Sequence, residues 1–244
     1  PKFGISLIKK LAKRIPATDG YLSLRFKLDA YLGGFPSADE QRFSLWLSSM
    51  EPENLDRLCA PISDGELSRG RIFKCIENFL TSVKGKTLQE KFLYFYQKIF
   101  LPEFICMHTD RAAMQYSLEV RSPFLSLPLI EFANRLPQRM RIRFGERKWL
   151  LKEIMRQRGY PKVITKQKKQ GFTFPVARWL KTTLRDELNQ TCEDTERLAD
   201  FINMAELKKL RDEHLSGREN HYRILFNLIV FRRWRLRFPS VAVN

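Results

Sequence analysis

Helix-capping sequences recur along this chain and restrict what it can fold into. Ser37-Ala-Asp-Glu40 and Thr87-Leu-Gln-Glu90 fit the capping box, in which an N-cap hydroxyl and a carboxylate three residues later satisfy free backbone donors. After the second box, apolar residues from Phe92 to Ile99 recur at i, i+3, i+4 and i+7, which predicts one apolar stripe on a helix. The alternation of strands and helices typical of a parallel sheet does not occur. The sequence therefore predicts an all-α chain.

Prolines separate the predicted helices, because proline lacks a backbone donor and crowds the preceding turn. Two short extended pieces are expected at Met140–Arg143 and Gly171–Phe174. Residues 1–244 are expected to form a single helical region, with a possible weak boundary near residues 84–87 and a loose tail at 239–244. The further predicted helices cover residues 3–14, 21–32, 54–58, 65–80, 111–118, 128–136, 147–157, 176–188, 205–214 and 222–238.

The composition indicates a globular protein. With 244 residues, 43% of them hydrophobic, the chain can bury a proper core. Its best membrane candidate, Leu225–Phe231, ends at Arg232 and falls far short of the roughly 18 apolar residues that a span needs. The N-terminus reads as an amphipathic helix without a cleavage site after an apolar core. We therefore expect a cytoplasmic protein without a membrane span.

Cysteines and histidines do not form a metal-binding pattern. The four cysteines lie too far apart for a CxxC site, and the three histidines lack the spacing that places two ligands on one helical face. We predict reduced, mostly buried thiols and no metal site in this chain. The residues concerned are Cys59, Cys75, Cys106, Cys192, His108, His214 and His221.

The formal net charge of +17 raises a basic helical module for nucleic acid or an anionic surface as an alternative. Cations are densest at residues 162–169 and 232–237, where Trp234 stands among four arginines. They are otherwise spread along the chain, without an RNA-binding or zinc-finger signature. A nucleotide phosphate, a solvated surface or a missing acidic half of the protein explains the charge equally well, so nucleic acid is not the favoured partner.

The most informative stretch runs from Asp110-Arg-Ala-Ala-Met114 through Ser117-Leu-Glu-Val-Arg-Ser-Pro-Phe-Leu125. Glu119 and Arg121 stand where we predict the end of an apolar helix. An isolated charge would be costly to bury there, so a charge-assisted network is the expected arrangement, and both residues are interpreted as supporting a site rather than reacting. Ser122-Pro123 is expected to break this helix.

A second candidate, Lys168-Lys-Gln-Gly-Phe172, joins cations to a glycine. Glycine lets the backbone approach a ligand closely, and the cations suit phosphate. A solvated loop would also have this composition.

These segments resemble the asparagine synthetase (glutamine-hydrolysing) family. Between them, in the family's order, come Leu129-Ile-Glu-Phe-Ala133, Leu136-Pro137 and Lys148-x-x-Leu-Lys-Glu153. The resemblance implies the mostly helical C-terminal half of a synthetase domain of the adenine-nucleotide α-hydrolase type. The parallel sheet of such a domain, with its pyrophosphate loop, is not encoded in this chain.

The resemblance implies an ATP-dependent amide ligase that requires ATP and Mg²⁺. A carboxylate, aspartate in the type enzyme, attacks the α-phosphorus and releases pyrophosphate, and glutamine-derived ammonia then displaces AMP. Alignment on Gly171-Phe172 makes Lys169 the catalytic lysine that stabilises negative charge near the α-phosphate, with Lys168 as the alternative. The resemblance also implies supporting roles for Asp110, Arg111, Glu119 and Arg121, and an ammonia route near Val120, Ser122 and Leu125.

Other family features do not occur in this sequence. Ser-Gly-Gly-x-Asp-Ser and Gly-Glu-Gly-x-Asp-Glu loops, which bind ATP and Mg²⁺ in the family, are not found, and Pro1 is not the N-terminal cysteine of a glutaminase. We expect a piece of a longer protein, inactive alone, that works with the missing glutaminase and pyrophosphate-loop regions and forms a possible homodimer.

The acid that the enzyme would amidate stays open. Ser126 replaces the aspartate of Phe-Leu-Asp, and Gln167-Lys-Lys169 replaces the Arg-Pro-Lys common in the family, so aspartate, a polysaccharide sugar acid and a lactam precursor are all candidates. A non-catalytic relative that keeps the fold is a further alternative.

Overall fold

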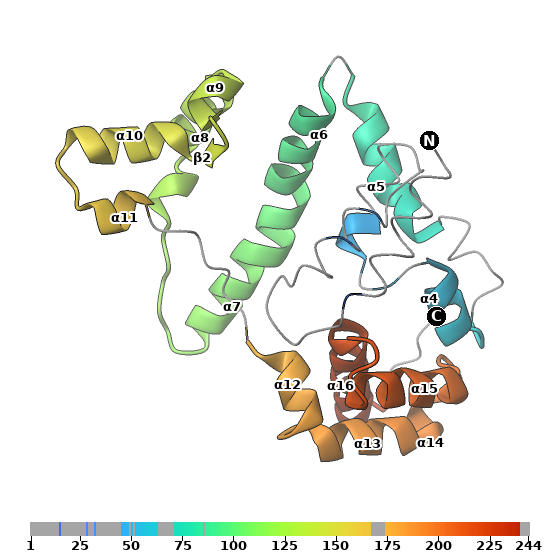
Figure 1. Cartoon of the computed structure of the whole chain (residues 1–244). Helices are drawn as coiled ribbons and strands as arrows, with labels where there is room; N and C mark the ends of the chain where they lie inside the picture. The colour runs from blue at the N-terminus through green and yellow to red at the C-terminus, as the bar shows by residue number, and fades with distance from the viewer. Residues whose placement is uncertain are drawn as a thin grey trace. The chain divides into compact units, whose positions relative to one another are not determined.

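The computed structural model describes residues 15, 28, 32, 45–48, 50, 52–62, 71–84, 86–166 and 174–239 (Figure 1). These residues are mostly helical, which confirms the predicted all-α class, and their only sheet is a two-stranded hairpin. The chain divides into two compact units. The first comprises Pro1–Gln97 and Thr173–Asn244, and the second comprises Lys98–Phe172.

The described helices of the first unit fall into an N-terminal and a C-terminal set. The predicted helix at 3–14 and the Ser37 capping box lie outside the described residues. The helices are α4 (Pro52–Leu58), α5 (Arg71–Ser82), α6 (Leu88–Phe95), α12 (Val176–Lys181), α13 (Arg185–Glu193), α14 (Thr195–Leu198), α15 (Met204–Leu215) and α16 (Tyr222–Arg237).

Helix α6 begins at the capping box that the sequence predicts. The Thr87 backbone N–H donates to Glu90 Oε2 at 2.9 Å, and the Glu90 N–H donates to Thr87 Oγ1 at 3.3 Å. Helix α5 packs beside α6, where the Phe79 ring stacks on Tyr94 with centroids 5.5 Å apart. Phe95, from the predicted apolar stripe, is buried. The local prediction of this helix start is confirmed.

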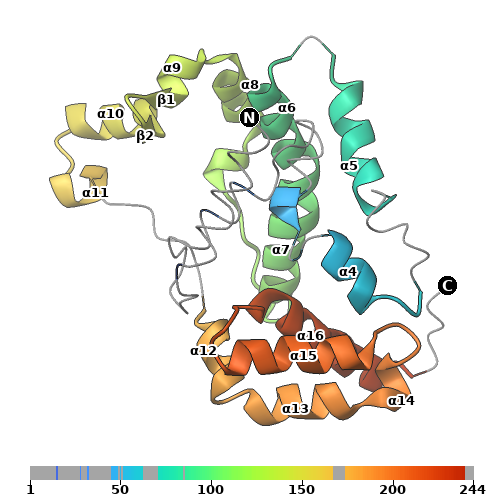
Figure 2. The same ribbon diagram turned by 45° about the vertical axis from the view of Figure 1, so that its right-hand side comes forward.

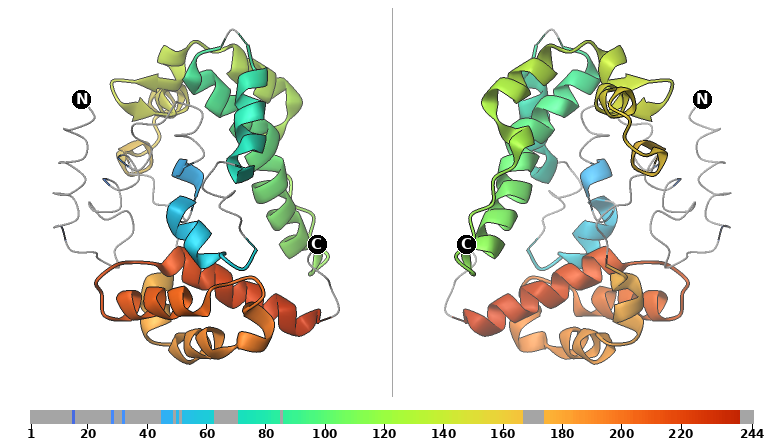
Figure 3. Two further views of the ribbon diagram at one scale, coloured as in Figure 1. Left: turned by 90° about the vertical axis from the view of Figure 1, so that its right-hand side faces the viewer. Right: turned by 90° about the vertical axis from the view of Figure 1, so that its left-hand side faces the viewer.

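The apolar core lies among the C-terminal helices. In Figure 2 α12 to α16 lie together, and in Figure 3 α16, in red, runs along the orange helices of this set. Ile224, Leu225, Leu228 and Ile229 form the buried stripe of α16. Burying each side chain of this size contributes roughly 1.5–3 kcal/mol. The stripe meets buried residues of α4 and α12 to α15, namely Leu58, Leu180, Leu188, Cys192, Leu198, Leu207 and Leu210.

Helix α4 is tied to this core by backbone as well as side chains. The Asn203 N–H donates to the Leu58 carbonyl at 2.7 Å. The Asn203 side chain also caps α15 by accepting from the N–H groups of Ala205 and Glu206, at 3.0 and 3.2 Å. One residue therefore begins a helix and joins segments far apart in the sequence.

The single helix predicted over residues 176–188 is wrong. It is broken into α12 and α13 by a turn, in which the Leu184 N–H donates to the Trp179 carbonyl at 2.7 Å. The Thr182 hydroxyl donates to the Arg178 carbonyl at 3.0 Å. Such side-chain bonds compete with the helix, and two adjacent β-branched residues, Thr182 and Thr183, weaken it further.

The second unit begins within a continuous helical stretch. The π-helix η1 (Tyr96–Cys106) joins α6 directly to α7 (Met107–Met114), and Pro102 lies inside it. Proline has no N–H to donate, which favours a departure from the α-helical pattern. The remaining elements are η2 (Pro123–Leu125), α8 (Leu127–Arg135), α9 (Gln138–Arg141), β1 (Ile142–Arg143), β2 (Glu146–Arg147), α10 (Trp149–Gln157) and α11 (Lys162–Lys166).

Strands β1 and β2 form a tight antiparallel hairpin, with Arg143 opposite Glu146. The two turn residues, Phe144 and Gly145, both have positive φ, at 51° and 75°, as a type I′ turn requires. β1 confirms part of the extended piece expected at Met140–Arg143. The other expected piece, Gly171–Phe174, lies outside the described residues except for Phe174.

The second unit buries little of its side chains. Among described residues 98–166, Thr165 is the only buried one. Large apolar residues such as Tyr116, Phe124 and Phe132 are exposed. The core that the composition predicts therefore lies, among described residues, in the first unit.

Candidate functional site

The Asp110–Leu125 segment combines a helix end with an irregular run. Helix α7 ends at Met114 rather than at the predicted Leu118. The Ser117 N–H donates to the Met114 carbonyl at 3.1 Å, and the Leu118 N–H donates to the Ala113 carbonyl at 3.1 Å. These two bonds form a Schellman cap, with Ser117 at φ 57° in the position that usually holds glycine.

The predicted helix break at Ser122-Pro123 is also wrong, because the helix has already ended. Residues 118–122 form no regular element, and Pro123 begins the 3-10 helix η2 instead. A proline suits a first helical turn, where its missing N–H is not needed.

Glu119 and Arg121 form an ion pair within this run, between Arg121 Nη2 and Glu119 Oε1. The expected charge-assisted contact is therefore present, but the burial behind that expectation is not. The Glu119 side chain is 68% exposed and that of Arg121 is 85% exposed. Such exposed pairs contribute little to stability, so this pair is available to interact with something else.

The remaining supporting candidates lie on both sides of this pair. Asp110 and Arg111 are exposed residues of α7, with Asp110 in its first turn. The three ammonia-route candidates, Val120, Ser122 and Leu125, are also exposed. Asp110–Leu125 thus presents its candidate residues at the surface of the second unit, as a series of accessible side chains.

Lys168 and Lys169 lie outside the described residues. The role expected for Lys169 therefore stays a prediction from the resemblance.

A separate polar cluster holds the hairpin against α10. Glu146 Oε1 accepts from Arg156 Nη2 at 2.6 Å and from Lys152 Nζ at 3.0 Å. These hydrogen bonds, that from Arg156 first, hold the pKa of Glu146 below its ordinary value. Glu146 therefore stays ionised at neutral pH and ties β2 to α10 through Lys152 and through Arg156 in the last turn of that helix.

The thiols do not form a reactive site. Among residues that the structure describes, no group of three His, Cys, Asp or Glu side chains could hold a metal ion. All four cysteines are free, but only Cys192 is buried and Cys75 is exposed, so the prediction of mostly buried thiols is wrong. Burial raises the pKa of Cys192 to about 11.

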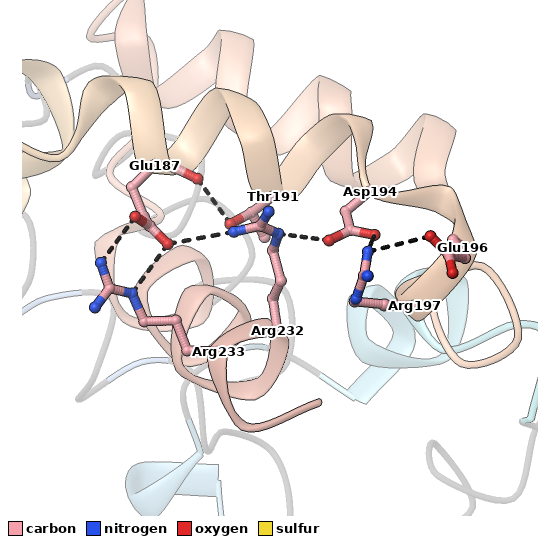
Figure 4. Close-up of polar contacts among 7 residues, drawn as sticks. All are labelled: Glu187, Thr191, Asp194, Glu196, Arg197, Arg232 and Arg233. Atoms are coloured by element: carbon pink, nitrogen blue, oxygen red, sulfur yellow. Dashed lines mark hydrogen bonds and ion pairs between the residues drawn. The ribbon is translucent and has the colours of Figure 1, made fainter. Parts of the chain in front are cut away.

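The C-terminal arginines bear on the alternative of a nucleic-acid module. Arg232 Nε donates to Asp194 Oδ2 at 2.6 Å, and Arg233 Nη2 donates to Glu187 Oε2 at 2.8 Å (Figure 4). Arg235 lies over the Phe201 ring, 5.3 Å from its centroid. These cations of the tail serve contacts within the first unit, which weakens the tail as a binding surface.

The family model described as asparagine synthase matches residues 14–236. This chain belongs to the asparagine synthase family. The match contains every ordered motif from Asp110 to Phe172, together with most of both compact units. No solved structure shows significant similarity to the chain. In the part of the chain that the structure covers, no helix is long and apolar enough to cross a membrane.

Curated relatives of the chain are named as glutamine-hydrolysing asparagine synthetases. "Asparagine synthetase [glutamine-hydrolyzing] 1" of Bacillus subtilis (strain 168) is 23% identical over 201 residues, 74% of this chain and 31% of the relative. A "Putative asparagine synthetase [glutamine-hydrolyzing]" of Mycobacterium bovis is 27% identical over 139 residues, 57% of this chain and 21% of the relative. A Mycobacterium tuberculosis (strain H37Rv) protein matches identically well. The chain thus spans less than a third of these relatives' length.

Two structural features of the site region escaped the sequence reasoning. The left-handed cap at Ser117 was missed because its usual signal is a glycine, and serine gives none. The Glu146 cluster was missed because its members, Glu146, Lys152 and Arg156, come from a strand and a helix whose spacing follows no single period.

Proposed function

We propose that this chain is the C-terminal helical part of an ATP-dependent amide ligase that converts aspartate to asparagine with glutamine-derived ammonia. The family match over residues 14–236 carries the proposal, together with relatives named as glutamine-hydrolysing asparagine synthetases. Aspartate is preferred over sugar acids and lactam precursors because those names indicate asparagine as the product.

The reaction consists of two displacements. The aspartate side-chain carboxylate attacks the α-phosphorus of ATP, which forms an acyl-adenylate and releases pyrophosphate. Ammonia then attacks the acyl carbon, and AMP leaves with the electron pair of the broken acyl–oxygen bond. Negative charge develops beside the α-phosphate in the first step. A cation held there stabilises the transition state more than the ground state.

Lys169 is the cation that we assign to this charge, with Lys168 as the alternative in a shifted alignment. Glu119 and Arg121 are assigned as positioning residues, with Asp110 and Arg111 on the preceding helix. Their exposure leaves them accessible to other parts of the enzyme. Val120, Ser122 and Leu125 are assigned to the ammonia route on the same basis.

Mg²⁺ is expected to accompany ATP, but the described residues do not fit a metal site. They contain no group of three carboxylate, histidine or cysteine side chains that could hold the ion. No described side chain is therefore assigned to Mg²⁺. The residues that would hold ATP and the metal, and those that release ammonia, are proposed to lie in other parts of the enzyme, and the 244-residue chain alone is proposed to be inactive.

The test uses the natural full-length gene product that contains this chain. Pyrophosphate release is measured with ATP, Mg²⁺ and aspartate, and asparagine formation is measured with glutamine added. Lys169→Ala is expected to lower pyrophosphate release by about 100-fold or more while the circular dichroism spectrum is unchanged. Lys168→Ala is the matched control and is expected to keep most of the activity.

Two results would contradict this assignment. Near-normal pyrophosphate release by Lys169→Ala would refute the role of that lysine, and a large loss in Lys168→Ala alone would move the role to its neighbour. A wild-type protein that releases no pyrophosphate with aspartate would refute the proposed substrate.

A further inference from the structure

The segment from Arg135 to Lys166, here named the basic arm, has an unusually one-sided charge. It runs from the end of α8 through the β hairpin to α11. Its only acidic residues are Glu146 and Glu153. Its cations are Arg135, Arg139, Arg141, Arg143, Arg147, Lys148, Lys152, Arg156, Arg158, Lys162 and Lys166.

The structure separates cations with an internal role from those that face solvent. Lys152 and Arg156 are paired with Glu146, and Arg141 donates to the Leu136 carbonyl at 2.6 Å, which caps the end of α8. The remaining eight are exposed, and none of them is in an ion pair with a described residue. These eight are Arg135, Arg139, Arg143, Arg147, Lys148, Arg158, Lys162 and Lys166.

This distribution distinguishes the basic arm from the C-terminal tail. In the tail, Arg232 and Arg233 are neutralised by Asp194 and Glu187. In the basic arm the two carboxylates are already used by Lys152 and Arg156. Most of the arm's positive charge is therefore uncompensated locally, which is the condition for attracting a polyanion.

Phe144, at the tip of the hairpin, adds a second and independent observation. Its side chain is 95% exposed. Its φ of 51° is also unfavourable for a bulky residue, and an asparagine would suit this first position of a type I′ turn far better. Neither burial nor backbone conformation explains a phenylalanine here. The contact of the ring with Arg143 leaves it almost fully exposed, so a partner from outside the chain would account for it better.

The surroundings of Phe144 indicate what that partner is. The Arg143 guanidinium lies over the Phe144 ring at 5.3 Å and over the Trp149 ring at 4.8 Å. Arg147 follows on the opposite strand. A protein contact centred on Phe144 would need a rim of further contacts that exclude water, whereas the hairpin surrounds the ring with charge. Cations beside an exposed ring are the arrangement that binds phosphates while a base stacks.

We propose that the basic arm binds single-stranded nucleic acid, with its exposed cations on the phosphates and Phe144 stacked on a base. This inference does not rest on the proposed ligase activity. A second copy of this chain is a poor occupant, because both carry a net charge of +17. Arginine predominates among the free cations, which also suits phosphate, since its planar fork binds two oxygens at once.

The experiment measures fluorescence anisotropy of a labelled 12-nucleotide oligouridine titrated with the 244-residue chain. Binding is expected at 50 mM KCl. The affinity should fall steeply by 200 mM KCl, because the release of counterions from the nucleic acid becomes less favourable as the salt concentration rises. Phe144→Asn is expected to weaken binding about 5-fold or more, although it improves the turn. Arg139→Ala and Arg147→Ala should each reduce the slope of log affinity against log salt by about 0.7.

Two matched controls distinguish binding by the basic arm from an effect of any exposed ring or any exposed cation. Tyr116→Ala removes another exposed ring of the second unit, and Arg218→Ala removes an exposed cation of the first unit. Both are expected to leave affinity within about 2-fold of wild type.

Three outcomes overturn the proposal. They are no binding at 50 mM KCl, an affinity that Phe144→Asn leaves unchanged, and an equal loss in Tyr116→Ala. In the first case, Phe144-dependent binding to vesicles of anionic lipid or to polyglutamate would assign the arm to a different partner.

Discussion

Arg232 provides the sharpest test of how the first unit is held together. Its Nε donates to Asp194 Oδ2 at 2.6 Å, and its Nη1 lies 3.3 Å from Glu187 Oε1. The Arg232 side chain is 13% exposed and that of Asp194 is 6% exposed. Arg232→Ala therefore leaves a nearly buried carboxylate with only one arginine partner, Arg197.

The free-energy cost of removing the Arg232 side chain can be estimated from these contacts. A hydrogen bond to a charged group contributes about 1.5–3 kcal/mol, and the longer contact to Glu187 adds less than about 1 kcal/mol. We expect Arg232→Ala to lower the free energy of unfolding by about 2–3 kcal/mol. Arg233→Ala is the matched control, because Arg233 shares Glu187 but is 64% exposed, and its cost should stay below about 1 kcal/mol.

Urea unfolding followed by far-ultraviolet circular dichroism measures both variants. The pH dependence of the free energy of unfolding provides a second test. Burial alone would raise the pKa of Asp194, but hydrogen bonds from Arg232 and Arg197 lower it below its ordinary value. A carboxyl whose pKa is lower in the folded state stabilises the protein above its unfolded pKa, near about 4, and this stability is lost as pH falls through the folded pKa.

Without Arg232 the pKa of Asp194 is lowered less, so the free energy of unfolding of Arg232→Ala should fall less than that of wild type as the pH drops below about 4. If Arg232→Ala costs no more than Arg233→Ala, or if its pH profile below about 4 matches that of wild type, the argument for a buried charge network is refuted.

Two further predictions concern single residues. Cys192 is buried and its pKa is raised to about 11, so it should resist alkylation by iodoacetamide at pH 8 while the exposed Cys75 reacts. Peptide mass spectrometry measures both. Equal labelling would contradict the packing of α13. Ser117→Gly should raise the free energy of unfolding by about 0.5–1 kcal/mol in thermal melts, because glycine adopts φ 57° without strain, and Ser117→Ala should not; a gain in both would exclude a backbone cause.

Local signals in the sequence predicted much of this fold. The Thr87 capping box and the apolar periodicity of α16 each depend on residues within a few positions of one another, so the start of α6 and both ends of α16 were predicted close to the observed positions. The break at Thr182 was not predicted, because apolar periodicity continues across it while a side-chain hydrogen bond ends the helix. A local hydrogen bond of the side chain, which apolar periodicity does not register, decided that case.

The candidate site divides in the same way. The sequence identified Glu119 and Arg121 as a pair, and the ion pair is present, because two residues apart is within direct reach. Their burial was not correctly predicted, since it depends on what surrounds residues 118–122. The contact between Arg232 and Asp194 joins residues 38 positions apart, and no local pattern could indicate it.

The π-helix η1 has a consequence for how this family's motif can vary. Each π turn takes up about one residue more than an α turn, so the angular phase at which α7 begins depends on the turns of η1 that precede it. Deleting one residue within η1 would rotate α7 by about 100° about the helix axis relative to the preceding turns of η1. The direction in which the side chains of Asp110 and Arg111 point from the helix axis is thus set by how many residues η1 contains. We therefore expect insertions and deletions in η1 to be tolerated less well than substitutions.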